Sequence, residues 1–352
     1  MARQIRVLVV DDSAFNRVSL GKMLEQIPGV DIVGYASDGE IGLRKVIELK
    51  PDLITLDLEM PKMGGFTMLR FVMQSCPTPV LVISSRSSEG DVFKALELGA
   101  IDFVAKPSRP ISSQFYSIQA DLQRKVLDFS NCGPEQFRFH QTMRRDEVVS
   151  VSSDPLSTAP KSRCPQAIVI GASTGGPPAL HEFFSRFISP PELSFAVAQH
   201  MPPGFTRSFA ARLNDHSVFN VTEAVSGDIM LPGHVYVCPG GRNLALRRVS
   251  GEVKIQIVTP PVSQIYTPSV DVLFESAAVA YGPELLCLIL TGMGNDGAAG
   301  VRAVRDSGGR VIAEAEESCV VYGMPKEAVA TGCVSQIIPL AGLRDEVLRC
   351  CQ

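Results

Sequence analysis

Short apolar runs alternate with amphipathic segments along the first third of the chain. The runs predict buried β-strands over residues 5–10, 30–35, 53–58, 80–84 and 102–105. The segments between them repeat apolar residues at helical spacing and predict a helix after Ser13 and helices near 39–49, 67–74, 91–98 and 112–129. Strict alternation of this kind favours a doubly wound, flavodoxin-like parallel sheet whose functional residues lie at the carboxyl ends of its strands.

This alternation stops near residue 131 and returns after residue 165. The stretch between them, residues 132–164, is rich in serine, threonine and proline and poor in residues that build a core, which indicates an extended linker. We therefore expect an α/β protein with two domains, residues 1–131 and 165–352, joined by this linker.

The second region opens with an apolar run that ends in Gly171-Ala-Ser-Thr-Gly-Gly176 and leads into a helical segment near 179–187. This pattern predicts a strand, a tight turn and a helix. Further strands are expected at 194–198, 235–237, 285–290, 311–313 and 334–338. A hairpin of 244–249 and 253–258 is expected to add antiparallel strands to a Rossmann-like, mostly parallel sheet.

Polar residues gather at the predicted strand ends of the first domain, namely Asp11, Asp12, Asp57, Ser84 and Lys106. Three converging carboxylates repel one another, and a hard divalent ion such as Mg²⁺ is the simplest way to hold them together. A carboxylate neutralised in this way can attack a phosphoryl donor. The alternative for any single acid is a helix cap or a loop position.

The predicted strand ends of the second domain carry Ser173, His200 and Asp296. A serine hydroxyl needs an imidazole to accept its proton and a carboxylate to orient that ring, and these three residue types supply both. Each has a simpler alternative: the turn around Ser173 could bind phosphate or be a sharp corner, His200 could be a structural histidine, and Asp296 could be a helix cap.

Two rival functions follow from the same turn. The chain order of serine, histidine and aspartate differs from the serine, aspartate, histidine order of the α/β-hydrolases, which disfavours that superfamily. A dinucleotide could bind the glycine-rich turn, although Ser173 stands where the Gly-x-Gly-x-x-Gly fingerprint has its second glycine. A binding module that docks partners without turnover is a further alternative.

Composition narrows the choice of partner and compartment. The 352 residues hold 33 lysines and arginines against 37 acids, a formal charge of -4, so no basic field favours nucleic acid or an anionic membrane. The absence of a long apolar run predicts no membrane insertion and a cytoplasmic protein. The nine cysteines have no paired metal-ligand spacing, which favours reduced thiols over disulfides or zinc.

Residues 4–131 resemble a two-component response-regulator receiver domain. The matching positions are the Asp11-Asp12 pair, Asp57 with Met60-Pro-x-Met-x-Gly65, Ser84, and Lys106-Pro107. The resemblance implies that Asp57 accepts a phosphoryl group from the phosphohistidine of a sensor histidine kinase.

The same resemblance implies a role for other residues of this domain. Asp12 and the backbone carbonyl of Glu59 would bind Mg²⁺ together with Asp57, and Asp11 would contact the ion through water. Phe103 stands where the family keeps an aromatic switch residue, and a core phenylalanine is the alternative.

Residues 166–342 resemble the catalytic domain of the CheB family of chemotaxis protein-glutamate methylesterases. The matching blocks are Gly171–Gly176, Gln199–Pro202 with Phe205-Thr206, Pro268–Asp271, Thr291–Gly297 and Tyr322–Pro325. The resemblance implies Ser173 as nucleophile, His200 as base, Asp296 as orienting acid and the Met293 amide as oxyanion donor. Asn243 departs from the family, because many relatives have histidine there.

The activity implied by this resemblance is phosphorylation-activated hydrolysis of glutamate γ-methyl esters on the cytoplasmic helices of methylated chemoreceptors. Deamidation of receptor glutamines is implied as a second activity. Serine chemistry suits both reactions, and no cofactor is expected in the catalytic domain. The unphosphorylated receiver is expected to inhibit the second domain until Asp57 is phosphorylated.

Overall fold

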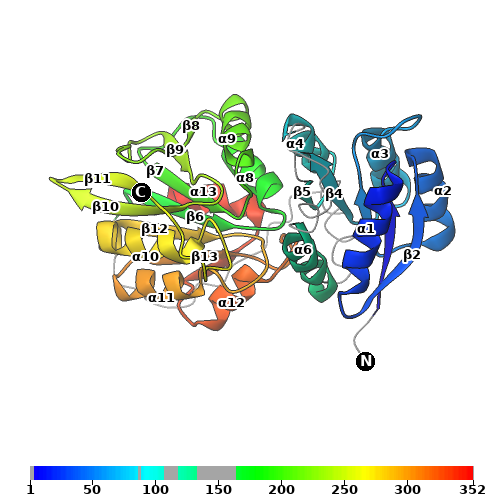
Figure 1. The fold of residues 1–352 in the computed structure, drawn as a ribbon. Coiled ribbons are helices and arrows are strands. Elements are labelled where there is room, and N and C mark those ends of the chain that lie inside the picture. Colours follow the sequence, from blue (N-terminus) through cyan, green and yellow to red (C-terminus); the bar gives the residue numbers. More distant parts are fainter. Residues whose placement is uncertain (1–3, 86–88, 107–117, 133–163, 352) are drawn as a thin grey trace. The chain divides into compact units, whose positions relative to one another are not determined.

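The computed structural model describes residues 4–85, 89–106, 118–132 and 164–351. The chain divides into two compact units, Met1–Met143 and Arg144–Gln352, which are drawn in Figure 1. All but the two end residues of the predicted linker, 132–164, lie outside the described residues, as do Pro107 and residues 112–117 of the last predicted helix. The domain boundaries at 131 and 165 stay predictions.

The first unit contains a five-stranded sheet in the order β2-β1-β3-β4-β5, and all of its strand pairs are parallel. The strands are β1 (Ile5–Val10), β2 (Val30–Ala36), β3 (Leu53–Leu56), β4 (Val80–Ser85) and β5 (Asp102–Lys106). This order is the flavodoxin-like one, so the predicted fold class of this unit is confirmed. One strand is shorter than predicted: β3 ends at Leu56, and Asp57 is the first residue beyond it.

Four described helices connect these strands, α1 (Ala14–Glu25), α2 (Gly39–Leu49), α3 (Gly65–Ser75) and α4 (Glu89–Glu97), and α6 (Gln119–Cys132) follows β5. Side-chain caps explain why two of them begin where they do. Ser13 accepts a hydrogen bond from the Asn16 amide at α1, and Asp38 accepts one from the Ile41 amide at α2.

The second unit contains a seven-stranded sheet in the order β14-β13-β12-β6-β7-β9-β8, again with every pair parallel. The strands are β6 (Ala167–Ala172), β7 (Ser194–Gln199), β8 (Asn220–Glu223), β9 (His234–Val237), β12 (Leu285–Ile289), β13 (Arg310–Glu314) and β14 (Gln336–Ile338). The order of strands reverses between β6 and β12. In sheets of this kind ligands bind beyond the carboxyl ends of the strands at such a switch point.

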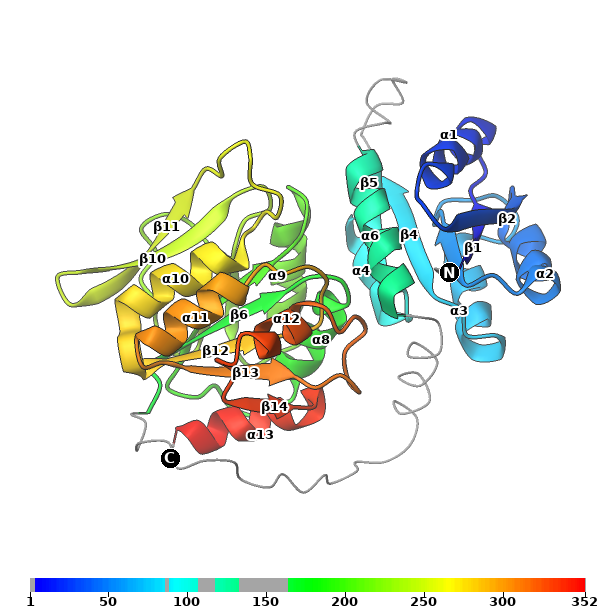
Figure 2. The ribbon, with the colours of Figure 1, turned by 90° about the horizontal axis from the view of Figure 1, so that it is seen from below.

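Helices cover both faces of this sheet (Figure 2). One face carries α10 (Val270–Tyr281), α11 (Ala298–Asp306) and α12 (Met324–Ala330), and the other carries α8 (Gly176–Ser185), α9 (Phe205–Asp215) and α13 (Leu340–Cys350). A short turn of 3₁₀ helix, Gly282–Glu284, follows α10. Within the described part of the chain, no helix is long and apolar enough to span a membrane.

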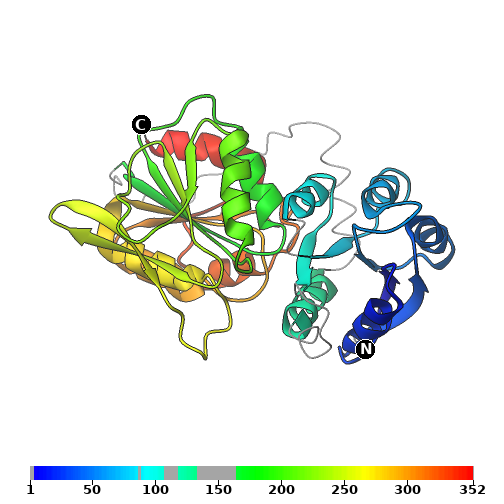
Figure 3. The ribbon, with the colours of Figure 1, turned by 45° about the horizontal axis from the view of Figure 1, so that its top comes forward.

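The predicted hairpin is present as β10 (Asn243–Val249) and β11 (Glu252–Val258), but the prediction that it extends the main sheet is wrong. The two strands form a separate sheet that lies beside α10 (Figure 3). Their inward residues Leu244, Leu246, Val253 and Ile255 are buried in the same cluster as α10. The edge next to β9 is occupied by β8, a short polar strand that the hydrophobic pattern did not indicate.

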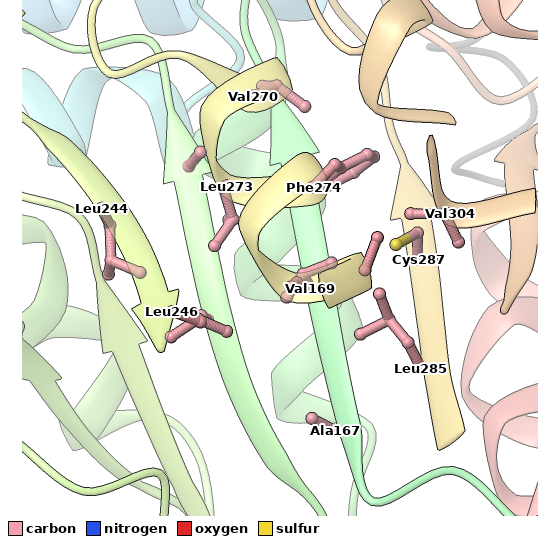
Figure 4. Packing of buried hydrophobic residues seen from close by; sticks show 14 of the residues in the cluster. Ala167, Val169, Leu244, Leu246, Val270, Leu273, Phe274, Leu285, Cys287 and Val304 are labelled. Carbon is pink, nitrogen blue, oxygen red and sulfur yellow. The ribbon is translucent and has the colours of Figure 1, made fainter. Parts of the chain in front are cut away.

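The core beneath α10 fixes the position of that helix. Figure 4 shows Val270, Leu273 and Phe274 of α10 in the same buried cluster as Val169 of β6. These side chains are fully buried, and burial of each contributes about 1.5 to 3 kcal/mol. A Cβ on Gly171 would lie 2.3 Å from Val270, so only glycine lets the start of α10 approach the end of β6.

Candidate active site and phosphoacceptor site

Parallel strands bring the predicted catalytic residues of the second unit to one edge of the sheet. Ala172 of β6 is in register with Gln199 of β7, so Ser173 and His200 leave adjacent strand ends. The His200 amide donates to the Ala172 carbonyl at 3.0 Å. Asp296 comes from the loop after β12, which pairs with β6 on its other side. The predicted triad residues therefore converge at the switch point of the sheet.

The imidazole of His200 and the carboxylate of Asp296 form a buried pair. His200 Nε2 lies 2.7 Å from Asp296 Oδ2. The other ring nitrogen, Nδ1, is buried and has no hydrogen-bond partner within the described part of the chain. Ser173 is 2% exposed, and its hydroxyl makes no hydrogen bond to the His200 ring in this structure. Rotation of a serine side chain is a small change, and catalytic hydrogen bonds often form only when substrate binds.

Asp296 is held in its ionised form by donors at the start of α10. Its oxygens accept hydrogen bonds from Ser269 Oγ at 3.0 Å, from the Val270 amide at 2.7 Å and from the Asp271 amide at 3.0 Å. Burial alone would raise the pKa of this carboxyl. The hydrogen bond and charge of His200 and the two amides outweigh burial and keep the pKa below its ordinary value.

Asp271 completes a reciprocal arrangement that sequence reasoning missed. Its Oδ1 accepts hydrogen bonds from the Gly297 amide at 2.9 Å and the Gly300 amide at 2.7 Å, at the start of α11. Asp296 thus caps α10, the helix that contains Asp271, and Asp271 caps α11, the helix that follows Asp296. Burial raises the pKa of Asp271 to about 6, and the charge of Asp296 adds to the shift. In the sequence this residue was marked only as the last position of the matching block Pro268–Asp271, with no role assigned.

The loop after β12 lies directly against Ser173. The Ser173 amide donates to the Thr291 carbonyl at 3.0 Å. A Cβ on Gly292 would lie 2.7 Å from the Ser173 Cβ, so a larger residue would push this loop away. Met293 is the next residue, and its role as oxyanion donor stays a prediction.

Glu314, at the end of β13, is a second buried acid that sequence reasoning missed. It is fully buried and accepts hydrogen bonds from the Thr291 amide at 2.8 Å and from Ser318 Oγ at 3.0 Å. Burial raises the pKa of its carboxyl to about 7, against the opposing effect of these donors. Glu314 therefore supports the loop that lies against Ser173. No sequence motif marks it.

Tyr266 covers one face of the His200 ring. The two rings are stacked, with centroids 5.1 Å apart and planes inclined by 11°. The phenol oxygen would lie 2.3 Å from a Cβ on Gly294, so the tyrosine also packs over the loop after β12. No pattern in the sequence pointed to this residue, which lies in an irregular segment between β11 and α10.

In the first unit, Lys106 binds two of the predicted carboxylates. Its Nζ lies 2.8 Å from Asp11 Oδ2 and 2.5 Å from Asp57 Oδ2. Burial raises the pKa of Asp57 to about 6, although the Lys106 ammonium lowers it and the Asp11 carboxylate adds to the increase. The carboxyl ends of β1, β3 and β5 thus meet as the sequence predicted.

Asp12 and Glu59 lie beside this pair of acids. Carboxylate oxygens of Asp11, Asp12 and Asp57 lie within 4.8 Å of one another, and Asp12 is exposed to solvent. The Glu59 amide donates to Asp57 Oδ1 at 3.2 Å, which places the Glu59 backbone at the same edge. A set of hard oxygen donors that is open to water on one side fits Mg²⁺, an ion that keeps several waters.

The resemblance to receiver domains predicts three switch residues, Ser84, Phe103 and Lys106; Lys106 binds the acids as described above, and the other two lie in different surroundings. Ser84 is 1% exposed, and its buried hydroxyl has no hydrogen-bond partner among the residues that the structure describes. Phe103 is buried in the core, where its ring meets Phe93 edge to face at 6.4 Å and Lys125 Nζ lies 4.9 Å above it. In this structure Phe103 therefore has the packing of a core residue, and its role as a switch stays a prediction.

Comparison with known proteins identifies both halves of the chain. Residues 168–347 match the model of the CheB methylesterase family, and residues 7–112 match the response regulator receiver domain. A protein-glutamate methylesterase/protein-glutamine glutaminase of Geobacter sulfurreducens is 47% identical, covering 99% of this chain and 98% of the relative. One from Myxococcus xanthus is 47% identical, covering 96% of this chain and 95% of the relative.

A solved structure agrees with these matches. The CheB methylesterase catalytic domain of Thermotoga maritima covers 53% of this chain and 98% of its own, at 37% identity and a TM-score of 0.51. The relatives match nearly the full length of the chain, and the family model matches half of it. Both findings lead to the same conclusion. The chain belongs to the CheB methylesterase family and carries a response regulator receiver domain before its methylesterase domain.

Proposed function

We propose that the chain is a serine hydrolase that removes methyl groups from glutamate γ-methyl esters on chemoreceptor helices and deamidates receptor glutamines. The observation that supports this best is the buried His200–Asp296 pair at 2.7 Å, whose free nitrogen Nδ1 lies at the strand end beside Ser173. The printed names of the relatives, protein-glutamate methylesterase/protein-glutamine glutaminase, describe the same two activities.

The geometry assigns the two ring nitrogens of His200 to different tasks. With Nε2 donating its proton to the Asp296 carboxylate, Nδ1 carries the lone pair that accepts the proton of Ser173. The low pKa of Asp296 keeps the carboxylate charged, which stabilises the imidazolium formed during attack. Asp296 is thus the orienting acid and His200 the base.

The reaction then proceeds in two halves. The Ser173 oxygen attacks the ester carbonyl while its proton passes to His200 Nδ1, and the Met293 amide donates to the oxyanion. The tetrahedral intermediate expels methanol, which takes the proton from Nδ1, and leaves an acyl-enzyme. Water repeats the sequence, with His200 again accepting the proton, and releases the glutamate carboxylate. A glutamine side chain follows the same route and releases ammonia.

In the receiver unit, Asp57 is the proposed phosphoacceptor and a sensor histidine kinase of the chemotaxis type is the proposed donor. Asp11, Asp12, Asp57 and the Glu59 carbonyl would hold Mg²⁺. When bound, the ion supplies positive charge next to the transferred phosphoryl oxygens. Lys106 already contacts Asp57 and would bind the same oxygens.

Ser84 and Phe103 would report phosphorylation to the rest of the chain. The buried Ser84 hydroxyl without a partner is a donor available to the new phosphoryl group, and Phe103 would repack in response. We propose that phosphorylation activates the esterase. A gain of about 1.4 kcal/mol for the active form changes its population about tenfold. The proposed location of these reactions is the cytoplasm, where methylated receptor helices and the kinase are accessible.

The test is methanol release from methylated receptor membranes, measured with and without acetyl phosphate and Mg²⁺. Wild type should release methanol faster with the phosphodonor, and Ser173→Ala should release none while keeping its melting temperature. Unchanged release by Ser173→Ala would favour the rival interpretation, a docking module that works without turnover. Mass spectrometry of receptor glutamines in the same samples tests deamidation separately.

A further inference from the structure

The segment between β11 and α10, residues 259–267, presents large apolar side chains to solvent. Val262 is 106% exposed and Ile265 is 82% exposed. Figure 3 shows this segment as a yellow loop that projects from the second unit. A single exposed apolar residue is ordinary, so the exposure alone carries no conclusion. The connections of this loop to the active site are what give it meaning.

Hydrogen bonds fasten the loop to the proposed catalytic acid. Gln264 and Asn243 exchange two side-chain hydrogen bonds, at 2.8 and 3.0 Å. Asn243 Oδ1 also accepts from the Ser269 amide at 2.9 Å, and Ser269 Oγ donates to Asp296 at 3.0 Å. These hydrogen bonds already hold the loop in one conformation in the free protein. Binding of a partner therefore costs little free energy for ordering the loop.

The loop also reaches the His200 ring. Tyr266 stacks on the imidazole at 5.1 Å, and Ile265 is its immediate neighbour, about 3.8 Å away along the backbone. His200 and Ser173 leave adjacent strand ends, so this loop lies beside the sheet edge that a substrate side chain has to reach. Val262 and Ile265 are thus placed to contact whatever carries the scissile bond.

The chemistry of the loop selects the kind of partner. Residues 259–267 read Thr-Pro-Pro-Val-Ser-Gln-Ile-Tyr-Thr and carry no charge. A loop with exposed apolar side chains and no charge favours a neutral partner surface, and a glutamate whose charge is masked as a methyl ester is such a surface. We infer that residues 259–267 are a substrate-docking loop in which Val262 and Ile265 bind the receptor helix around the methylated glutamate.

This inference rests on the proposed function and deepens it, and two substrates separate them. The double variant Val262→Ser/Ile265→Ser is assayed as the full chain with Mg²⁺ and acetyl phosphate. On methylated receptor membranes its KM should rise about tenfold, equivalent to about 1.4 kcal/mol, with kcat within about twofold of wild type. On p-nitrophenyl acetate, an ester too small to be held by Val262 and Ile265, both constants should stay unchanged.

The matched control is Val279→Ser. Val279 is 90% exposed but lies in the last turn of α10, about 13 Å along the helix from Val270 at the active-site end. This variant should match wild type on both substrates. Melting temperatures of all three proteins should agree, because the substituted side chains contact little of the fold.

Each other outcome has a distinct meaning. A receptor KM that stays at the wild-type value overturns the docking loop while leaving the proposed function intact. Faster hydrolysis of p-nitrophenyl acetate without phosphodonor, with an unchanged receptor KM, would show that the receiver unit covers the loop instead, and also overturns the inference. Absence of methanol release by wild type removes the proposed function, and the docking loop with it.

Discussion

Asp296 and Asp271 are neighbouring buried acids that cap each other's helices, yet only Asp296 contacts His200. Replacing each with asparagine separates orientation of the imidazole from support of the fold. In wild type, hydrogen-bond donors face both carboxylate oxygens of Asp296. The amide group of Asp296→Asn has only one oxygen that can accept from them. In either orientation at least one buried donor is left unsatisfied, which costs about 1 to 3 kcal/mol of stability.

The effect of Asp296→Asn on catalysis depends on which atom faces His200. If the amide nitrogen does, Nε2 must accept a hydrogen bond, Nδ1 carries the proton and the base is lost, with a fall in kcat of about 10⁴-fold. If the oxygen does, the tautomer survives but the charge that stabilises the imidazolium is gone. The loss of a charged hydrogen bond, about 3 kcal/mol, then lowers kcat about 10²-fold.

Asp271→Asn is the control. Both hydrogen bonds that cap α11 end on one oxygen, Asp271 Oδ1, and an asparagine oxygen can accept both. The variant should keep kcat within about threefold of wild type on p-nitrophenyl acetate, with no loss of stability near pH 8, because burial already disfavours the charge of Asp271. Equal activities for the two variants, measured with urea unfolding in parallel, would refute the assigned role of Asp296.

Three further predictions concern other residues. Burial raises the pKa of Glu314 to about 7 from an ordinary 4.5, so the native state binds this proton more tightly than the unfolded chain does and stability falls as the pH rises through this window. The free energy of unfolding of Glu314→Gln, measured in urea, should not fall in this way. Relative to wild type, it should gain about 2 kcal/mol between about pH 5 and 8. Tyr266→Phe should keep kcat, whereas Tyr266→Leu should lower kcat about tenfold at constant KM, because leucine has no ring face for the His200 cation; equal kcat values for the two variants would argue for packing alone. Asp57→Asn should abolish stimulation of methanol release by acetyl phosphate and Mg²⁺, and persistent stimulation would move the phosphoacceptor elsewhere.

Alternation of strands and helices was enough to predict both sheets and the edge at which polar residues gather. Because the carboxyl ends of parallel strands share one edge, Ser173, His200 and Asp296 could be grouped although they are far apart in the chain. The same reasoning grouped Asp57 with Lys106. Short strands were harder: β8, Asn-Val-Thr-Glu, has one buried side chain and no alternation to detect.

Features that depend on packing between distant segments could not be predicted. The hairpin of β10 and β11 has the hydrophobic pattern of any pair of strands that is buried on one face. Its apolar face packs against α10 instead of extending the main sheet, and the local sequence does not show this choice. Asp271 and Glu314 are ordinary acids in the sequence. Their roles arise because backbone amides of other segments donate hydrogen bonds to them, which no local pattern encodes.

The central claim is that His200 Nδ1, with Asp296 on the opposite nitrogen, makes the Ser173 hydroxyl a nucleophile. Labelling of the full chain with a fluorophosphonate, in Mg²⁺ and acetyl phosphate, tests this without a receptor substrate. Peptide mass spectrometry should locate the adduct on Ser173, and His200→Gln should remove the adduct while leaving the melting temperature unchanged. An adduct on another residue, or labelling of Ser173 that persists without the imidazole, would contradict the account.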